Sequence, residues 1–406
     1  MSVINGGEPT RKKYLQYGRQ YIDDEDIRSV IEALKSDFLT TGPLVEEFER
    51  KFADYVGSKY AVAVSNGTAA LHIACLAAGL QKGDEGITTP ITFAASSNCM
   101  LYCGAKPVFC DINLDDYNID ENKIKSYINE KTKVILPVDF TGQCCNIGKI
   151  MRIAKENNLI VIQDASHSLG TKYLDKQIGS IADMTTFSLH PVKTITSGEG
   201  GVVTTNSLAL YEKLKLYKTH GITKSKGNLR NKEHPEWYYE QIYLGYNYRI
   251  TDLQSALGIS QLNKIEKFIT KRKKLVNLYN KLLKDIDGII LQKEAYYSDT
   301  SRHLYIIRLD LNKFKATRDD IYSALVAENI GVNIHYIPVY KHPYYKEIGY
   351  EDVICENAET FYNSSITLPL HVNMDESDIK DVVNALKDVL DYYKRWKNEY
   401  CCYSSS

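Results

Sequence analysis

A lysine and an aspartate each follow an apolar run that is typical of a β-strand. Lys193 lies between the run at 184–188 and a glycine-rich turn at 198–201, whose glycines let the backbone turn back into a further strand. Asp164 ends the apolar run that starts at Leu159. Alone, such a lysine is usually a solvated loop residue, and such an aspartate caps a helix or pairs with a cation. Their joint placement is what suggests chemistry.

A lysine amine near a carboxylate is the pair that pyridoxal 5'-phosphate needs, because the cofactor is attached through an amine and its pyridine nitrogen requires an acidic partner. A buried Asp164 would be costly without such a positive partner. Burial and a neighbouring pyridinium would lower the pKa of Lys193, which suits a nucleophile that also carries protons. We therefore expect Lys193 and Asp164 to be the catalytic residues.

The segment 65–72 could bind the cofactor phosphate. It follows an expected strand and opens an apolar helix, so its first backbone N–H groups would face an anion. An ordinary capped helix after a tight turn also explains this pattern. The candidate phosphate ligands are Asn66, Gly67, Thr68, Ala69 and, at the end of a separate strand, Ser188.

Other residues could contact the cofactor ring or a second anion. Phe93 follows a short apolar segment and could stack on a planar ring, although core packing is the usual fate of phenylalanine. His167 could contact the ring hydroxyl, or it could simply cap and pack. Asn247 and Arg249 combine an amide with a guanidinium before an expected helix, which suits phosphate binding, although an aromatic turn with a surface arginine fits as well.

These residues need a framework, and the chain predicts one between about 60 and 205. Short apolar runs alternate there with helical segments, which favours a mostly parallel sheet covered by helices on both faces. Ligands bind such sheets beyond the carboxyl ends of the strands, where Asp164 and Lys193 would meet. The expected strands are 60–64, 107–111, 134–138, 159–163, 184–188 and 201–204.

Helical and mixed patterns surround this region. An amphipathic helix at 23–34 opens the fold, and a long helical region is expected at 251–284. Strands at 304–309 and 332–336 with helices at 319–329 and 379–390 predict a smaller α+β domain. We therefore expect an N-terminal segment at 1–20 that contributes to the substrate site, a large α/β domain at 21–255, a small C-terminal domain at 256–398 and a disordered tail at 399–406.

Composition narrows the partners. The 406 residues carry 50 Lys and Arg against 51 Asp and Glu, so no long-range positive field attracts nucleic acid. The nine cysteines lack the spacing of a disulfide framework or a zinc site, and we expect reduced thiols and no metal. The beginning of the sequence does not resemble a signal peptide, and no run is long enough for a membrane span. We expect a cytoplasmic protein that makes no contact with a membrane.

Taken together, the chain resembles the DegT-type nucleotide-sugar aminotransferases over about 17–390. The resemblance is carried by segments that occur in the family's order, at 65–72, 88–93, 164–167, 188–193, 198–201, 220–223 and 245–249. It implies the fold type I of pyridoxal-phosphate-dependent transferases and a homodimer with active sites shared between subunits.

The same resemblance implies roles for single residues. Lys193 would bind the cofactor covalently, Asp164 would meet its pyridine nitrogen, and Ser188, Gly67 and Thr68 would bind its phosphate. Three more family positions complete the set: Phe93 would cover the ring, His167 would lie beside its hydroxyl, and Asn247 would reach the phosphate from the neighbouring subunit.

Within the family, segments 88–93, 237–249 and 335–345 look most like the C4 transaminases of pseudaminic acid biosynthesis. That resemblance implies L-glutamate as amino donor and UDP-2-acetamido-2,6-dideoxy-β-L-arabino-hex-4-ulose as acceptor. Another nucleotide-linked 4-keto or 3-keto sugar, such as the D-configured epimer, stays open. Two other functions also stay open: a sugar dehydratase of the same fold, although histidine replaces the lysine there, and a catalytically silent cofactor-binding regulator.

The positions that match substrate-binding residues of the family are Tyr17, Asp37, Phe38, Leu39, Thr40, Arg249, His335, Tyr336, Ile337 and Pro338.

One departure from the family concerns a strand. Gly86 stands where relatives usually place a β-branched residue, and a glycine there is expected to weaken the strand by about 1 kcal/mol.

Overall fold

A seven-stranded sheet forms the centre of the large domain in the computed structural model, which describes residues 3–225, 227, 229–231 and 233–394. The strand order is β1-β9-β8-β5-β4-β2-β3, and β8, β5, β4, β2 and β3 are parallel. Strand β9 runs antiparallel to both of its neighbours. The expected mostly parallel sheet is therefore confirmed. The strands are β1 (Tyr60–Val64), β2 (Glu85–Thr88), β3 (Lys106–Phe109), β4 (Thr132–Leu136), β5 (Ile160–Asp164), β8 (Met184–Ser188) and β9 (Gly201–Thr205).

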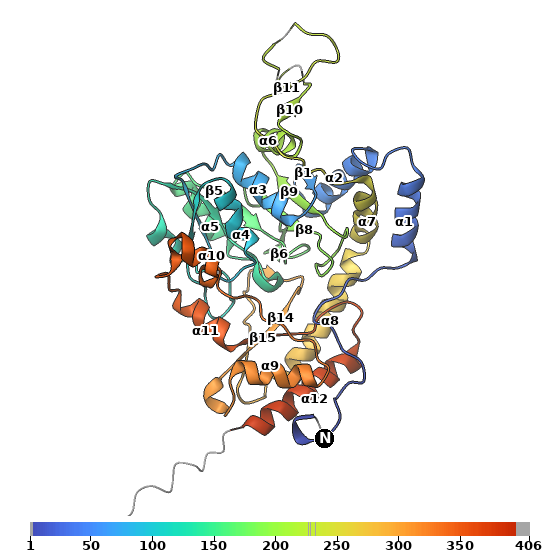
Figure 1. Cartoon of the computed structure of the whole chain (residues 1–406). Helices are drawn as coiled ribbons and strands as arrows, with labels where there is room; N and C mark the ends of the chain where they lie inside the picture. Colours follow the sequence, from blue (N-terminus) through green and yellow to red (C-terminus); the bar gives the residue numbers. More distant parts are fainter. Residues whose placement is uncertain (1–2, 226, 228, 232, 395–406) are drawn as a thin grey trace, which may run out of the picture.

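Helices cover the sheet, as Figure 1 shows. The helices up to residue 262 are α1 (Asp24–Lys35), α2 (Pro43–Val56), α3 (Gly67–Ala77), α4 (Ala95–Tyr102), α5 (Ile147–Glu156), α6 (Leu208–Lys218) and α7 (Asp252–Leu262), with α1 lying outside α7. The first of them begins at a capping box made by Asp23 and Asp26. It packs on α7 through polar groups, since the buried Asp26 accepts hydrogen bonds from Ser260 and Gln261. Its apolar side chains Ile27 and Leu34 stay exposed in the single chain.

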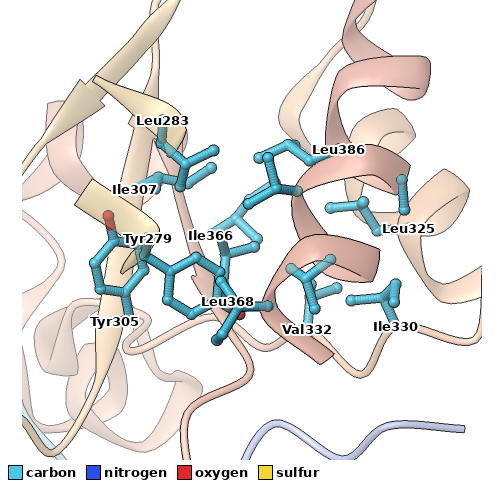
Figure 2. Close-up of a cluster of buried hydrophobic side chains, with 14 of the residues drawn as sticks. Tyr279, Leu283, Tyr305, Ile307, Leu325, Ile330, Val332, Ile366, Leu368 and Leu386 are labelled. Atoms are coloured by element: carbon cyan, nitrogen blue, oxygen red, sulfur yellow. The ribbon is translucent and has the colours of Figure 1, made fainter. Parts of the chain in front are cut away.

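A three-stranded antiparallel sheet organises the small domain, with the order β12-β14-β15. Beyond α7 the chain forms α8 (Ile265–Leu283), β12 (Ile289–Leu291), β14 (Tyr305–Leu309), α9 (Arg318–Ala327), α10 (Pro343–Tyr345), α11 (Glu356–Ser364), β15 (Ser365–Leu368) and α12 (Glu376–Tyr393). Figure 2 shows the core of the small domain, where Ile307 and Ile366 of the sheet meet Leu325 and Leu386 of the helices. The domain boundaries remain a prediction; residue 255 falls inside α7. The tail expected at 399–406 lies outside the described residues.

Short elements connect these parts. The two-residue strands are β6 (Lys172–Tyr173), β7 (Lys176–Gln177), β10 (Ile222–Thr223), β11 (Glu240–Gln241) and β13 (Ser298–Asp299). Tight 3-10 turns lie at Val3–Asn5, Ile124–Tyr127, Phe140–Gly142, Leu311–Lys313 and Val339–Lys341, and a π-helical turn lies at Lys346–Tyr350. The β10–β11 hairpin projects from the body as an arm above α6 (Figure 1); its residue Trp237 is exposed, as is Leu244, which follows β11.

Two expected elements differ from the structure. The helical region at 251–284 is two helices, which are separated at Asn263 and Lys264. The expected strand at 332–336 is not a strand, because only Asn333 pairs with a neighbouring strand, at Thr367. Nδ1 of the His335 ring instead lies 2.8 Å from the Thr367 hydroxyl, in hydrogen-bonding contact.

The weakening of the strand at Gly86 stays a prediction, and the packing around this glycine shows why no side chain is present there. A Cβ atom at Gly86 would lie 2.6 Å from Sδ of Met100 and 2.7 Å from a methyl carbon of Val134. Glycine is therefore the residue that lets α4 and β4 pack closely on β2. No helix in the described part of the chain is both long and apolar enough to cross a membrane.

Candidate active site

A cavity of about 870 Å³ opens at the carboxyl ends of β5 and β8, between the large sheet and the small domain. Every predicted cofactor residue except Asn247 lines it, as do the predicted substrate residues Tyr17, His335 and Tyr336. The residues brought together from the cofactor set are Asn66, Gly67, Thr68, Ala69, Phe93, Asp164, His167, Ser188 and Lys193.

Lys193 sits on the loop between β8 and β9. The loop is tied at its base, because Leu189 N–H donates to the carbonyl of Gly200 at 2.9 Å and the Thr196 hydroxyl donates to the Leu189 carbonyl at 2.9 Å. The amine reaches the cavity and is partly buried. Burial lowers the pKa of Lys193 from 10.5 to about 8, against the opposing negative charge of Asp164. About one amine in ten is therefore neutral at pH 7, and the neutral amine is the state that can attack a carbonyl.

Asp164 ends β5 with 4% of its surface exposed. One carboxylate oxygen accepts from the Ser96 hydroxyl at 2.7 Å, and the other accepts from the backbone and hydroxyl of Ser166 at 3.0 and 2.6 Å. The Thr92 hydroxyl lies 2.7 Å from that of Ser96 and extends the network. These hydrogen bonds fix the orientation of the carboxyl group, which lines the cavity.

The first turn of α3 forms a close-fitting cradle against the end of β8. Asn66 caps the helix by accepting from the Ala69 N–H at 2.8 Å, and the N–H groups of a first turn have no partner within the helix. A Cβ atom on Gly67 would lie 2.9 Å from Cβ of Ser188. Glycine thus brings the backbone donors next to the Ser188 hydroxyl, an arrangement that suits a phosphate.

Three neutral histidines line the other side of the cavity. Burial and the charge of Lys193 lower the pKa of His335 to about 3. The same causes hold the pKa of His167 well below its usual value, and its Nε2 lies 3.3 Å from the Tyr336 hydroxyl. The His303 ring centroid lies 4.4 Å from that of His167, and burial also lowers its pKa. All three rings therefore act as neutral hydrogen-bonding groups near neutral pH.

Several observations fit pyridoxal 5'-phosphate. The cradle at Gly67 has no room for a side chain at that position, so the backbone N–H groups stay open to a ligand. The buried Nδ1 of His167 has no hydrogen-bond partner among the described residues. Phe93 is 63% exposed on the cavity wall, which leaves its ring free to cover a planar group. Asp164 places in the cavity the carboxylate that a protonated pyridine nitrogen would need as its partner. Among the described residues, no group of three or more histidine, cysteine, aspartate or glutamate side chains could hold a metal ion.

The remaining predicted residues lie outside this cavity in the single chain. Asn247 is exposed and pairs with Thr219 through its backbone. Arg249 lines a second cavity, of about 500 Å³, beside α2 and α6. Ile337 and Pro338 follow Tyr336 without lining the cavity, and the connection between α1 and α2 is exposed. That connection holds Asp37, Phe38, Leu39 and Thr40.

Sequence reasoning missed several cavity residues. Ser166 and Thr92 stand inside segments that the resemblance singled out, so their hydroxyls could have been assigned from position alone. His303 has no such signal, because it lies far from His167 in the sequence and the two rings meet only in the folded chain. Ser96, Tyr102, Glu199 and Tyr248 also line the cavity.

Comparisons with known proteins agree with this geometry. The DegT/DnrJ/EryC1/StrS aminotransferase family matches residues 20–387. The UDP-4-amino-4,6-dideoxy-N-acetyl-β-L-altrosamine transaminase of Campylobacter jejuni is 38% identical over 384 residues, which cover 94% of this chain and 99% of the relative. The spore coat polysaccharide biosynthesis protein SpsC of Bacillus subtilis is 38% identical over 385 residues, covering 94% and 98%.

Among solved structures, Helicobacter pylori PseC, an aminotransferase involved in the biosynthesis of pseudoaminic acid, superposes with a TM-score of 0.87 at 32% identity. The match covers 94% of this chain and all of that chain, and it places the sheet and the flanking helices in the aminotransferase fold type I. The chain therefore belongs to the DegT/DnrJ/EryC1/StrS aminotransferase family and is a sugar aminotransferase that depends on pyridoxal 5'-phosphate.

Proposed function

We propose that the chain transfers the amino group of L-glutamate to C4 of a UDP-linked 4-keto-6-deoxy-N-acetylhexosamine. The L-configured sugar of pseudaminic acid biosynthesis, UDP-2-acetamido-2,6-dideoxy-β-L-arabino-hex-4-ulose, is the first candidate. The observation that carries the proposal is the meeting of Lys193, Asp164 and the α3 cradle in one cavity with His335. The choice of sugar is supported by the name of the Campylobacter jejuni transaminase and by the PseC structure.

Each protein group has a defined task in this proposal. When bound, pyridoxal 5'-phosphate supplies an electron sink and carries the amino group between donor and acceptor. Lys193 holds the cofactor and then moves a proton to and from the reacting carbon, for which a pKa of about 8 is suited. Asp164 keeps the ring nitrogen protonated. The first turn of α3 and Ser188 bind the phosphate.

Residue identity at the attachment point can be tested directly. Borohydride reduction of the holoenzyme followed by peptide mapping should find the cofactor on the peptide that contains Lys193. Attachment at any other lysine would refute the assignment.

The donor and the sugar need a separate test. The enzyme is incubated with L-glutamate and UDP-linked 4-keto-6-deoxy hexosamines of both configurations, and the product is followed by mass and by its stereochemistry. The Lys193→Ala variant is the matched control. Product from the L-sugar supports the proposal; a preference for the D-configured epimer would replace the proposed sugar and leave the aminotransfer chemistry in place.

A homodimer belongs to the same proposal. Asn247 is exposed and lies outside the cavity of its own chain, which suits a residue that reaches a neighbouring subunit. Exposed apolar side chains at Ile27, Leu34 and Trp237 offer surface for the contact. Mixing Lys193→Ala and Asn247→Ala chains tests it, because hybrid dimers would regain one intact site. If mixing restores no activity, the idea of shared sites is contradicted.

The free thiols of the described cysteines agree with a cytoplasmic location, which we include in the proposal.

A further inference from the structure

The N-terminal strap, defined here as residues 3–17, lies against the small domain beside α9 and α12, as Figure 1 shows for its first turn. Its far end is Tyr17, which lines the active-site cavity. The strap is therefore the route by which an early part of the sequence reaches the active site.

Glu328 holds the beginning of the strap. Its carboxylate is fully buried at the end of α9. One oxygen accepts from the Val3 N–H at 2.6 Å, and the other accepts from the N–H and the hydroxyl of Thr10 at 2.8 and 2.7 Å. A buried carboxylate is costly unless it is hydrogen-bonded, and all three of these donors belong to the strap.

The turn that follows Glu328 holds the rest of the strap. The Asn329 side chain donates to the Arg11 carbonyl at 2.8 Å, and its own carbonyl accepts from the Leu15 N–H at 2.9 Å. Gly331 N–H then donates to the Leu15 carbonyl at 2.7 Å. A Cβ atom on Gly331 would lie 2.4 Å from that carbonyl oxygen, so glycine permits the close approach.

Tyr17 of the strap and His335 of the small domain meet at the cavity. Tyr17 lies two residues beyond Leu15, and its carbonyl accepts from the Leu370 N–H at 3.0 Å. The centroid of the Tyr17 ring lies 5.3 Å from that of the His335 ring. His335 belongs to the segment that continues from Gly331. One turn of the small domain thus sets the position of both the tyrosine and the histidine.

We propose that Glu328 is a positioning residue, which fastens the strap to the small domain and thereby holds Tyr17 in place to bind the sugar substrate. In the described part of the chain, its oxygens accept hydrogen bonds from Val3 and Thr10 of the strap, so its effect on the reaction would pass through Tyr17. The inference rests on the proposed function for the role of Tyr17, and on the contacts of Glu328 alone for the anchoring.

The variant Glu328→Gln tests the anchoring in the holoenzyme. Glutamine keeps the volume of the side chain but turns an amide N–H₂ group toward strap donors. Since hydrogen bonds to a buried carboxylate are among the stronger ones, we expect hydrogen exchange in the strap and tryptic cleavage at Lys12 and Lys13 to rise about tenfold. Asp381→Asn, which breaks only the partly exposed contact of Arg11 with Asp381, is the control and should change neither rate.

The kinetic test separates positioning from general damage. For Glu328→Gln we expect KM for the keto sugar to rise about tenfold, while 2-oxoglutarate formation from glutamate in the absence of sugar stays within about twofold. Tyr17→Ala should reproduce the rise in KM without faster exchange in the rest of the strap. Thr10→Val, which removes one bond to Glu328 from the strap side, should act in the same direction as Glu328→Gln, and the two effects should not add.

Two results would overturn the inference. One is an unchanged strap in Glu328→Gln, and the other is a loosened strap with an unchanged KM or with equal losses in both half-reactions. If the wild-type enzyme aminates none of the keto sugars, the proposed function fails instead. The exchange and cleavage rates then still decide whether Glu328 anchors the strap.

Discussion

The amine of Lys193 should titrate far below an ordinary lysine in the cofactor-free protein. Burial lowers its pKa from 10.5 to about 8, while the negative charge of Asp164 acts in the opposite direction. At pH 7, about one amine in ten is then neutral, and this neutral fraction is roughly 300-fold larger than that of a lysine with the unshifted value. At neutral pH, Lys193 should therefore react faster with an acylating reagent than exposed lysines do.

Trace labelling with an amine-directed acylating reagent measures this difference. The cofactor is removed, the protein is labelled over a pH series that brackets 8, and the peptide that contains Lys193 is compared with peptides of exposed lysines such as Lys82. Labelling of Lys193 should reach its midpoint near pH 8 and level off above it. A profile that follows the exposed lysines up to high pH would refute the reasoning, because it would mean that the cavity does not desolvate the amine.

The variant Asp164→Asn tests whether the charge of Asp164 raises the pKa of Lys193. Removing the carboxylate charge takes away the attraction that favours the protonated amine, so the midpoint for Lys193 should fall further below 8. A midpoint that rises in Asp164→Asn would show that the aspartate does not act on the amine through its charge.

Two further variants test the surroundings of the site. Ser96→Ala removes the 2.7 Å hydrogen bond to Asp164, a loss of about 1.5 kcal/mol. Cofactor retention, measured by equilibrium dialysis, should weaken about tenfold. Unchanged retention would mean that the bond does not support the carboxylate of Asp164. Gly86→Val should lower the free energy of unfolding by about 1–3 kcal/mol in urea because its side chain overlaps Met100 and Val134. Gly86→Ala should cost less than Gly86→Val, and a valine variant as stable as the wild type would show that α4 moves aside freely.

Local patterns predicted the parts of the site that sit at strand ends. Asp164 and Ser188 are the last residues of β5 and β8, and both positions follow directly from where apolar runs stop. Parallel strands then bring these ends to one edge, so the cavity itself was predictable. The direction of β9 was not, since an apolar run has the same pattern whether its neighbours run parallel or antiparallel to it.

Other features depend on contacts between distant segments. The run at 332–336 has the composition of a strand, but Thr367 bonds both the backbone of Asn333 and the ring of His335, and this leaves the segment irregular. The break between α7 and α8 contains no glycine or proline to mark it. Gly86 shows most clearly what sequence alone cannot predict. A glycine in a strand suggests a weak strand, whereas the packing of α4 and β4 on this strand requires the absence of a side chain.

The loop that carries Lys193 has a consequence for motion. Its two ends are fastened to each other at Leu189 and Gly200, so the backbone under the lysine acts as a stationary pivot, while the flexible four-carbon stem leaves the amine free to swing. A proton carrier has to visit more than one atom of the reacting molecule without letting go of its place in the fold. In the proposed reaction, the fastened backbone and the flexible stem would give Lys193 a short, bounded range of travel within the cavity that it lines.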